Sequence, residues 1–230
     1  MQRGVRRIGA LLLAIALVFL TEMQIAAAPQ IVYRHASSTG KKRVALTFDD
    51  GPHPRYTREI LEILAEYGVP ATFFVIGVNA ETYPELIKRE VAEGHEIGNH
   101  TYNHYHLSKL SAEAFEKDMQ KCAQTVNRII GREPILFRPP EGACSQHSKD
   151  FCEKNGYPII MWSVDTRDWA HTPIDEIVEN VKKNTKDGSI ILMHDFIGKN
   201  SPTPVALRRI IPMLQESGFE FVTVSQLLLG

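Results

Sequence analysis

From Arg43 onward the sequence alternates between short apolar runs and longer amphipathic segments, and this alternation restricts the fold more than any other feature. The short runs are rich in valine, isoleucine, leucine and phenylalanine, and their length predicts strands. In the longer segments apolar residues recur at helical spacing, as in Ile60, Leu61, Leu64 and Tyr67. Strands that alternate with helices predict an α/β fold with a parallel sheet, either open or closed into a barrel.

The predicted elements occupy one stretch of about 190 residues, in which we find no internal domain boundary. Strands are predicted at residues 44–48, 71–76, 95–97, 135–137, 159–164, 190–193 and 219–222. Helices are predicted at residues 56–67, 84–93, 111–130, 148–155, 173–184 and 203–217.

The N-terminus has a different composition from the rest of the chain. Arg3, Arg6 and Arg7 precede an apolar run at residues 8–20, and three alanines follow at residues 26–28. This order predicts a secretory signal peptide or membrane anchor over residues 1–28, and the run is short for a helix that spans a bilayer. Cleavage after Ala27, or no cleavage, stays open because cleavage after Ala28 would leave a proline at the new terminus. We expect the protein to work outside the cytoplasm, either secreted or anchored and facing the cell wall.

Residues 29–42 are predicted to be an irregular leader before a single domain at residues 43–230. The formal net charge of -1 gives no reason to expect nucleic acid or an anionic membrane surface as a partner. We expect a monomer that contacts a membrane only through an uncleaved N-terminal segment. Cys144 and Cys152 could pair in an oxidising compartment, or they and Cys122 could all be free thiols.

Polar side chains recur directly after the predicted strands. These residues are Asp49 and Asp50, then His100 and His104, Arg138 and Glu141, Asp165, Asp168 and Trp169, and finally His194 and Asp195. In open sheets and in barrels alike, the carboxyl ends of parallel strands meet at one face, where active sites lie. Each signal is weak alone, but their recurrence at successive strand ends predicts one shared site.

The residue types at this site suit a metal ion. His100 and His104 are four residues apart, so both rings would reach one metal if the segment were helical. Consecutive strand residues point to opposite sides, so Asp49 and Asp50 can diverge around the site. One carboxylate with two imidazoles leaves coordination positions open for water and substrate, as a catalytic metal requires. The second carboxylate is then free to accept a proton.

Five segments together resemble the polysaccharide deacetylases of carbohydrate esterase family 4. They are "TFDDGP" at residues 47–52, "HTYNH" at 100–104, "RPPEG" at 138–142, "DW" at 168–169 and "LMH" at 192–194. The resemblance implies a distorted (β/α) barrel with about seven units as the catalytic domain at residues 43–230. It also implies metal-dependent removal of acetyl groups from an N-acetylated glycan.

The resemblance further implies a role for each matching residue. Asp50, His100 and His104 would hold a divalent metal ion, with zinc the first expectation and cobalt, nickel or manganese also suited to this ligand set. The groups expected to take part in proton transfer are Asp49 as the general base, Arg138 as the residue that orients it, His194 as the general acid and Asp168 as the partner of that histidine.

Three further positions would bind the substrate. Trp169 and Leu192 would line the pocket for the acetyl methyl group, and the backbone N–H at Glu141 would contact the oxyanion. The family commonly has tyrosine where this chain has Glu141. The change removes an aromatic wall and adds a carboxylate, so we expect it to alter the choice of substrate and leave the metal site intact.

For most other residues near these motifs, we predict a structural role and not a functional one. We expect Phe73 and Phe74 to be core, Asp195 to be a turn or capping residue, and His95 and His106 to lie outside the metal site. Asp165 is a weaker candidate than Asp168 for the partner of His194. His53 could be a contact near the substrate or a solvated loop residue.

The sequence therefore predicts an extracytoplasmic, metal-dependent N-deacetylase that acts on peptidoglycan or a chitin-like oligosaccharide. Two alternatives remain open at this point. The chain could be a glycan-binding or structural wall protein on a deacetylase scaffold that has lost activity. It could also be another metallohydrolase, such as an O-acetyl esterase or a peptide amidase, because the same metal and base would serve those bonds.

Overall fold

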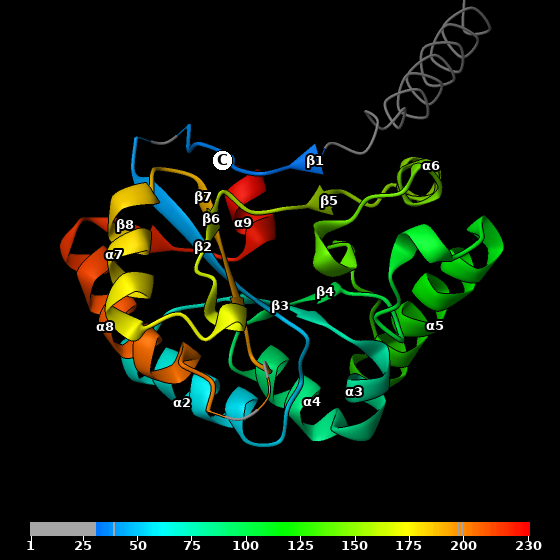
Figure 1. Ribbon diagram of the computed structural model, residues 1–230, viewed down its shortest axis with the longest axis horizontal. Coiled ribbons are helices and arrows are strands. Elements are labelled where there is room, and N and C mark those ends of the chain that lie inside the picture. Colours follow the sequence, from blue (N-terminus) through cyan, green and yellow to red (C-terminus); the bar gives the residue numbers. More distant parts are fainter. Residues whose placement is uncertain (1–30, 39, 197, 199) are drawn as a thin grey trace, which may run out of the picture.

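The structure is a computed structural model that describes residues 31–38, 40–196, 198 and 200–230. The predicted signal or anchor at residues 1–28 lies outside the described residues. The α/β prediction is confirmed, because parallel strands form a sheet in the order β4-β3-β2-β7-β6 (Figure 1). These strands are β2 (Lys42–Asp49), β3 (Thr72–Val75), β4 (Glu96–Asn99), β6 (Val164–Asp165) and β7 (Ser189–His194). β8 (Phe219–Phe221) pairs with the start of β2, and β1 (Ile31–Val32) pairs with β5 (Ile159–Ile160).

The pairings close into a distorted barrel. Phe137 forms a parallel bridge to Asn99 at the end of β4 and another to Ile159 at the start of β5. β5 is followed in the chain by β6, which pairs with β7, and β7 pairs along its whole length with β2. The strands therefore follow one another around the barrel as β2, β3, β4, Phe137, β5, β6 and β7, and β7 pairs with β2. The barrel has the fewest strand hydrogen bonds at Phe137, where the neighbours are joined only by single-residue bridges.

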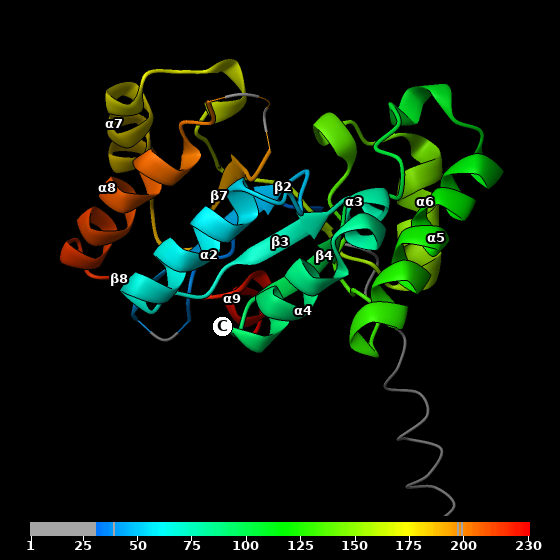
Figure 2. The same ribbon diagram turned by 90° about the horizontal axis from the view of Figure 1, so that it is seen from below.

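Helices cover the outside of this barrel (Figures 1 and 2). They are α2 (Tyr56–Tyr67), α3 (Gly77–Thr82), α4 (Pro84–Ala92), α5 (Ala112–Ile130), α6 (Gln146–Asn155), α7 (Ile174–Asn184) and α8 (Thr203–Glu216). The short α9 (Val224–Leu228) instead packs with interior strand residues such as Ala45. The sequence signals at helix ends are used as expected. Ser111 accepts a hydrogen bond from the N–H of Ala114 at the start of α5, and Gly131 ends that helix in the left-handed region.

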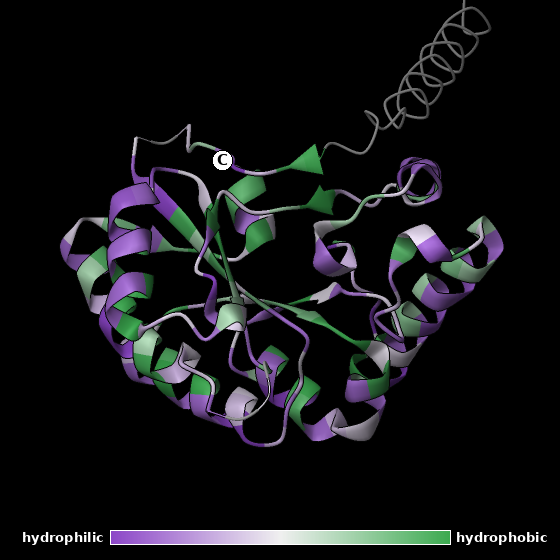
Figure 3. Cartoon of the chain, in the orientation of Figure 1, coloured by the Kyte–Doolittle hydropathy of each residue, from purple (hydrophilic) through white to green (hydrophobic). Residues whose placement is uncertain are grey.

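Alternation along β2 separates two parts of the core. Leu46 and Phe48 pack with the surrounding helices, whereas Ala45 belongs to a second buried cluster that includes Phe74. Figure 3 shows hydrophobic residues along the central strands, whereas the surrounding helices mix hydrophobic and hydrophilic residues. Because side chains alternate, Thr47 and Asp49 lie on the same side as Ala45. This register brings Asp49 to the carboxyl end of the barrel interior.

Two predicted strands differ from the structure. Residues 135–137 do not form a strand, and only Phe137 among them bridges its neighbours, because Pro134, Pro139 and Pro140 flank the segment and have no N–H for a ladder. Residues 159–164 are predicted as one strand but form β5 and β6, because the chain changes partners between them. The N–H of Met161 donates to Val32 and that of Ser163 donates to Ile190.

Short elements account for the other differences. The leader predicted to be irregular contains β1 and the first residue of β2, and it was missed because two residues give no readable alternation. α3 and α9 were likewise not predicted, since six and five residues are too short for a periodic pattern. Within the described ranges, we find no helix with the length and apolar character needed to cross a bilayer.

Candidate active site

The polar residues predicted at the strand ends lie around one pocket at the carboxyl end of the barrel. The pocket is lined by Asp49, Asp50, His100, His104, Glu141, Gly142, Trp162, Asp165, Trp169, Leu192 and His194. Arg138 and Asp168 are fully buried and contact the lining residues Asp49 and His194. Loops after β2, β4, β6 and β7, together with the segment after Phe137, therefore contribute to one site.

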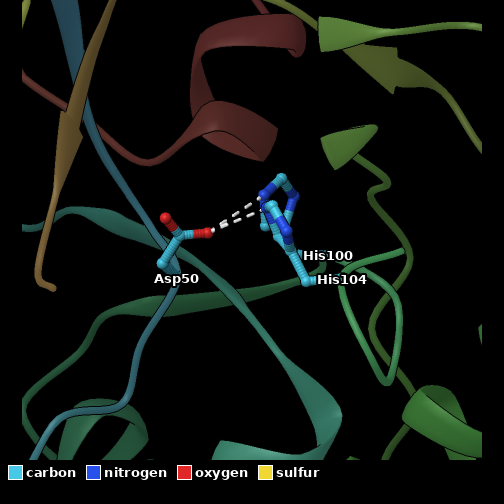
Figure 4. A group of neighbouring side chains, drawn as sticks. All are labelled: Asp50, His100 and His104. Atoms are coloured by element: carbon cyan, nitrogen blue, oxygen red, sulfur yellow. Dashed lines mark ion pairs between the residues drawn. The ribbon is translucent and has the colours of Figure 1, made fainter. Parts of the chain in front are cut away.

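Asp50, His100 and His104 converge as a candidate metal centre (Figure 4). Asp50 Oδ1 lies 3.5 Å from Nε2 of His100 and 3.2 Å from Nε2 of His104. One ligand atom from each residue lies within 4.8 Å of the others, and no other such group of three occurs among the described residues. A cation between these atoms would have two nitrogen ligands and one oxygen ligand, with room for others from the pocket.

The donor set fits a cation because electron-rich atoms face one another. His100 Nδ1 lies 2.7 Å from the carbonyl of Arg138, so a neutral ring donates there and presents a lone pair at Nε2. Asp50 Oδ1 is buried and receives no hydrogen bond. Burial alone would raise the pKa of Asp50, but the His100 and His104 rings together lower it by more. The net effect is a pKa below the usual value, so the carboxylate is anionic. The side chain of Asp50 raises the pKa of His104, as expected for a site that favours positive charge.

The backbone of residues 100–104 is a loop. The expectation that His100 and His104 reach one metal because the segment is helical is therefore wrong. Thr101 and His104 both lie in the left-handed region, with φ of 65° and 56°, and the turn brings both rings to the same side. Hydrogen bonds within the turn and from α5 hold this conformation. The N–H of His104 donates to Thr101 Oγ1 at 3.0 Å, and Asp118 of α5 accepts from the N–H groups of Tyr102 at 2.9 Å and Asn103 at 3.1 Å.

Asp49 is held by Arg138 beside the candidate metal centre. Nη1 of Arg138 donates to Asp49 Oδ1 at 2.7 Å and to Thr47 Oγ1 at 2.7 Å. The other guanidinium nitrogens donate to the carbonyls of Ile160 and Met161, both at 3.1 Å. Asp49 Oδ2 lies 3.8 Å from His100 Nε2, on the side of the metal ligands. One oxygen of the carboxylate is thus fixed by a cation, and the other faces the site.

His194 is held by a buried carboxylate, that of Asp168. Nδ1 of His194 lies 2.8 Å from Asp168 Oδ1, and the backbone N–H of His194 donates to Oδ2 at 2.8 Å. Thr203, at the start of α8, also donates to Oδ2 at 2.6 Å. Burial lowers the pKa of His194, but its hydrogen bond with Asp168, that carboxylate's charge and the charges of the two pocket aspartates raise it to about 9. The ring can therefore hold a proton at neutral pH.

The outer wall of the pocket contains the predicted substrate contacts. Leu192 is 3% exposed, whereas Trp169 is half exposed and its Nε1 donates to Asp165 Oδ1 at 3.3 Å. Glu141 has a positive φ of 56°, and its carboxylate lies 3.4 Å from Nε2 of His106. Trp162 lines the same pocket but was not singled out from the sequence, because an aromatic at the end of a buried run looks like core.

The remaining predictions have mixed outcomes. Phe73 and Phe74 are buried core residues, as predicted, and all three cysteines are free. His95 lies away from the metal ligands, where its Nδ1 accepts the N–H of Ala71. Asp195 lies in a bend directly after β7, which agrees with its prediction as a turn residue, but its side chain has a further structural role. It is fully buried and accepts a hydrogen bond from the hydroxyl of Thr57 on α2.

Comparison with known proteins identifies the family. The polysaccharide deacetylase family model matches residues 36–160, which include Asp49, Asp50, His100, His104 and Arg138. The chain belongs to the polysaccharide deacetylase family. A peptidoglycan-N-acetylglucosamine deacetylase of Bacillus cereus is 43% identical over 190 residues, which cover 82% of this chain and 89% of that protein. A chitooligosaccharide deacetylase of Sinorhizobium fredii is 40% identical, with coverage of 80% and 90%.

Solved structures agree with this membership of the polysaccharide deacetylase family. A crystal structure of a peptidoglycan N-acetylglucosamine deacetylase in complex with 4-naphthalen-1-yl-N-oxidanyl-benzamide matches with a TM-score of 0.81 and 39% identity. The match covers 85% of this chain and 92% of that one. The family fold thus accounts for nearly all of the described residues.

Proposed function

We propose that this protein is a metal-dependent N-deacetylase that hydrolyses the acetamido group of N-acetylglucosamine in a cell-wall glycan, with peptidoglycan as the first candidate. The observation that carries the proposal is the placement of two differently held groups around one candidate metal centre. Asp49 is fixed by Arg138, and His194 is fixed by Asp168. The names of the similar deacetylases support the acetylated sugar as substrate.

The chemistry requires a base and an acid on separate residues. An amide is a weak electrophile with a poor leaving group, so hydrolysis needs an activated water and a proton for the departing nitrogen. A divalent cation held by Asp50, His100 and His104 would lower the pKa of water and polarise the acetyl carbonyl. Zinc suits the nitrogen and oxygen ligands best, and cobalt, nickel or manganese would also fit.

The chain's own residues then move two protons. The Asp49 oxygen that Arg138 does not hold accepts a proton from water. At the same time the oxygen of that water bonds to the acetyl carbon. His194 donates the proton on Nε2 to the sugar nitrogen as the carbon–nitrogen bond breaks, which releases acetate and the free amine. Asp168 accepts a hydrogen bond from the Nδ1–H group of His194, so the proton that His194 can donate to the substrate is the one on Nε2.

Substrate orientation is assigned to the pocket wall. Leu192 and Trp169 would surround the acetyl methyl, and the N–H of Glu141 would donate to the carbonyl oxygen as negative charge develops. A substrate of this kind would place the protein outside the cytoplasm at the cell wall, with residues 1–28 as the signal or anchor and residues 43–230 as the catalytic domain. We propose that it acts there as a monomer, without nucleic acid as a partner.

The test is acetate release from a panel of glycans, before and after chelation and with metal added back. We expect release from N-acetylglucosamine oligomers or peptidoglycan, its loss on chelation and its return with zinc. Asp49→Asn should lower the rate at least about 100-fold. Release from acetylated xylan alone would favour the O-acetyl esterase, and cleavage of muropeptide amide bonds would favour the amidase. Glycan binding without release, unchanged in Asp49→Asn, would favour the non-catalytic wall protein.

A further inference from the structure

An exposed aromatic side chain lies close to the candidate active site but outside its pocket. Phe196 follows His194 by two residues, so their Cα atoms are at most about 7 Å apart, and 40% of its surface is exposed. The ring of His53, three residues after Asp50, stacks on Phe196 with centroids 4.5 Å apart and planes at 7°. Tyr56 stacks behind His53 at 5.1 Å. One face of Phe196 is therefore covered by His53, and much of the remainder faces solvent.

The start of α2 holds this aromatic stack in place. The hydroxyl of Tyr56 accepts the backbone N–H of Asn200 at 2.9 Å and that of Ser201 at 3.3 Å. Directly before Phe196 in the sequence, the buried Asp195 accepts a hydrogen bond from the hydroxyl of Thr57. The loop after β7 is thus fixed to α2 both before and after Phe196. Binding residues are often found on loops that a rigid scaffold holds in place, and the loop with Phe196 is held in this way.

His53 adds a defined polar group to the stack. Its Nδ1 accepts the backbone N–H groups of Arg55 at 3.3 Å and Tyr56 at 3.2 Å. Burial and the charge of Arg55 lower the pKa of His53, so the ring is neutral at neutral pH. With Nδ1 as an acceptor, the ring proton is on Nε2, which finds no acceptor among the described residues. A flat apolar face beside one N–H donor matches a pyranose ring, which has an apolar C–H face and hydroxyl groups at its edge.

We propose that Phe196 and His53 form a subsite for the sugar ring adjacent to the one whose acetamido group enters the pocket. This inference rests on the proposed function, because it takes the occupant to be the same glycan. The stack is continuous with the site through both of its loops. The loop after β2 contains Asp50 and His53, and β7 ends at His194 with Phe196 in the loop that follows it. The rings of Phe196 and His53 are themselves uncharged, and the nearby Arg55 lies over Tyr56 with its guanidinium 5.1 Å from that ring, so the exposed face of Phe196 suits the apolar face of a sugar ring.

The test measures how a chitin hexasaccharide binds when the stack is altered. Calorimetric titrations are made in the Asp49→Asn background so that the oligomer is not consumed. We expect Phe196→Ala to raise Kd roughly threefold to tenfold, the range for loss of one aromatic contact. Phe196→Tyr keeps the ring and should restore Kd. The matched control is Tyr33→Ala, because Tyr33 is 55% exposed and precedes Arg34, which bridges Ser189 at the opposite end of β7.

Rates in the otherwise unaltered protein separate stacking from a structural effect. Phe196→Ala should raise KM for the hexasaccharide while kcat stays within about twofold, because the ring binds the neighbouring sugar and not the reacting group. An unchanged Kd, or a lower kcat with unchanged KM, would overturn the subsite. If the unaltered protein releases no acetate from any glycan, the proposed function fails, and the titrations still decide whether Phe196 binds the sugar.

Discussion

Arg138 joins stability and chemistry in one side chain. Its guanidinium is fully buried and donates to Asp49, to Thr47 and to two backbone carbonyls, while Phe74 lies 4.1 Å from it. A buried charge is tolerated only when it is paired and its donors are satisfied, and Asp49 supplies the opposite charge. The contacts that make this burial tolerable are the same ones that fix the Asp49 carboxylate.

We expect Arg138→Lys to lower both the melting temperature and kcat. Lysine keeps the charge but has no planar fork, so the acceptors now held by Arg138 cannot all be satisfied. Each buried acceptor left unpaired costs about 1–3 kcal/mol, and misplacing the base costs roughly 100-fold in kcat. Thermal unfolding and acetate release measure the two effects. The exposed Arg128→Lys on α5 is the control, and an unaltered kcat in Arg138→Lys would contradict the positioning role.

Asp168→Asn should move the alkaline limb of the pH–rate profile to lower pH. The acid must be protonated, so the rate falls as pH rises through the pKa of His194, which Asp168 helps to raise to about 9. Removing the carboxylate charge lowers that pKa, and the rate should decline from a lower pH. Rates from pH 6 to 10 measure the limb. Asp165→Asn is the control, because Asp165 lines the pocket without contacting His194, and an equal displacement there would refute the assignment.

Single residues were predictable where their type is rare at a strand end. Asp49, Asp50, His100 and His194 interrupt or end apolar runs, and that contrast marks them. Residues that hold these groups from behind carry no such mark. Thr47 within β2 and Thr203 at the start of α8 look like ordinary strand and helix-start residues, and only the fold brings them to Arg138 and Asp168.

At the scale of elements, α5 positions a loop to which it is not adjacent in sequence. Asp118 is buried on this helix and accepts the N–H groups of Tyr102 and Asn103, between the two histidines of the candidate metal centre. A carboxylate that receives consecutive backbone N–H groups fixes a turn that would otherwise leave them unsatisfied. The left-handed residues Thr101 and His104 depend on this support.

We therefore expect Asp118→Ala to weaken zinc binding about 10-fold to 100-fold, the usual loss when a residue behind metal ligands is removed. The ligands stay present, but the turn that aligns His100 and His104 loses three hydrogen bonds, two from backbone N–H groups and one from the side-chain amide of Asn103. Calorimetric zinc titration gives the affinity. Asp150→Ala on α6 is the control, since Asp150 is exposed and accepts a side-chain hydrogen bond from Gln146. Equal zinc affinity in Asp118→Ala and the unaltered protein would show that α5 has no such role.

Elements were predictable in proportion to their length. The helices of ten or more residues and the longer strands have enough periods to be read, and β2, α5 and α8 appear close to their predicted bounds. The segment near Phe137 is different, because its place in the barrel depends on two single-residue bridges that involve residues far along the chain. No local pattern encodes such contacts, so two features could not be predicted from the sequence. They are the single-residue bridges at Phe137 and the division between β5 and β6.

Over the whole molecule, buried carboxyl groups extend from the pocket into the barrel wall. Behind the candidate site, Asp195 and Glu90 of α4 are fully buried carboxyl groups, and neither oxygen of Glu90 receives a hydrogen bond. Burial, followed by the charge of Asp195, raises the pKa of Glu90 well above its usual value. Burial likewise raises the pKa of Asp195 to about 7. Both groups therefore favour the protonated form in the folded protein.

This burial predicts how stability depends on pH. The unfolded chain loses the Glu90 proton near its ordinary pKa, whereas the folded protein keeps it, so the free energy of unfolding falls as pH rises above about 4.5. Glu90→Gln removes this group from the balance, so its melting temperature should match the unaltered protein at pH 4 and exceed it increasingly toward pH 8. Each 1 kcal/mol gained would raise the melting temperature by roughly 2–4 °C.

Thermal unfolding with a chelator present excludes the pH dependence of metal binding, and the contribution of His194 cancels because both proteins contain it. The exposed Glu62→Gln on α2 removes the same charge without removing a buried group, so it should show no such trend. A constant difference between Glu90→Gln and the unaltered protein from pH 4 to 8 would contradict a protonated Glu90. A growing difference would mean that the barrel wall tolerates its buried carboxyl groups by keeping them neutral, and that the negative charge is confined to the pocket where the cation binds.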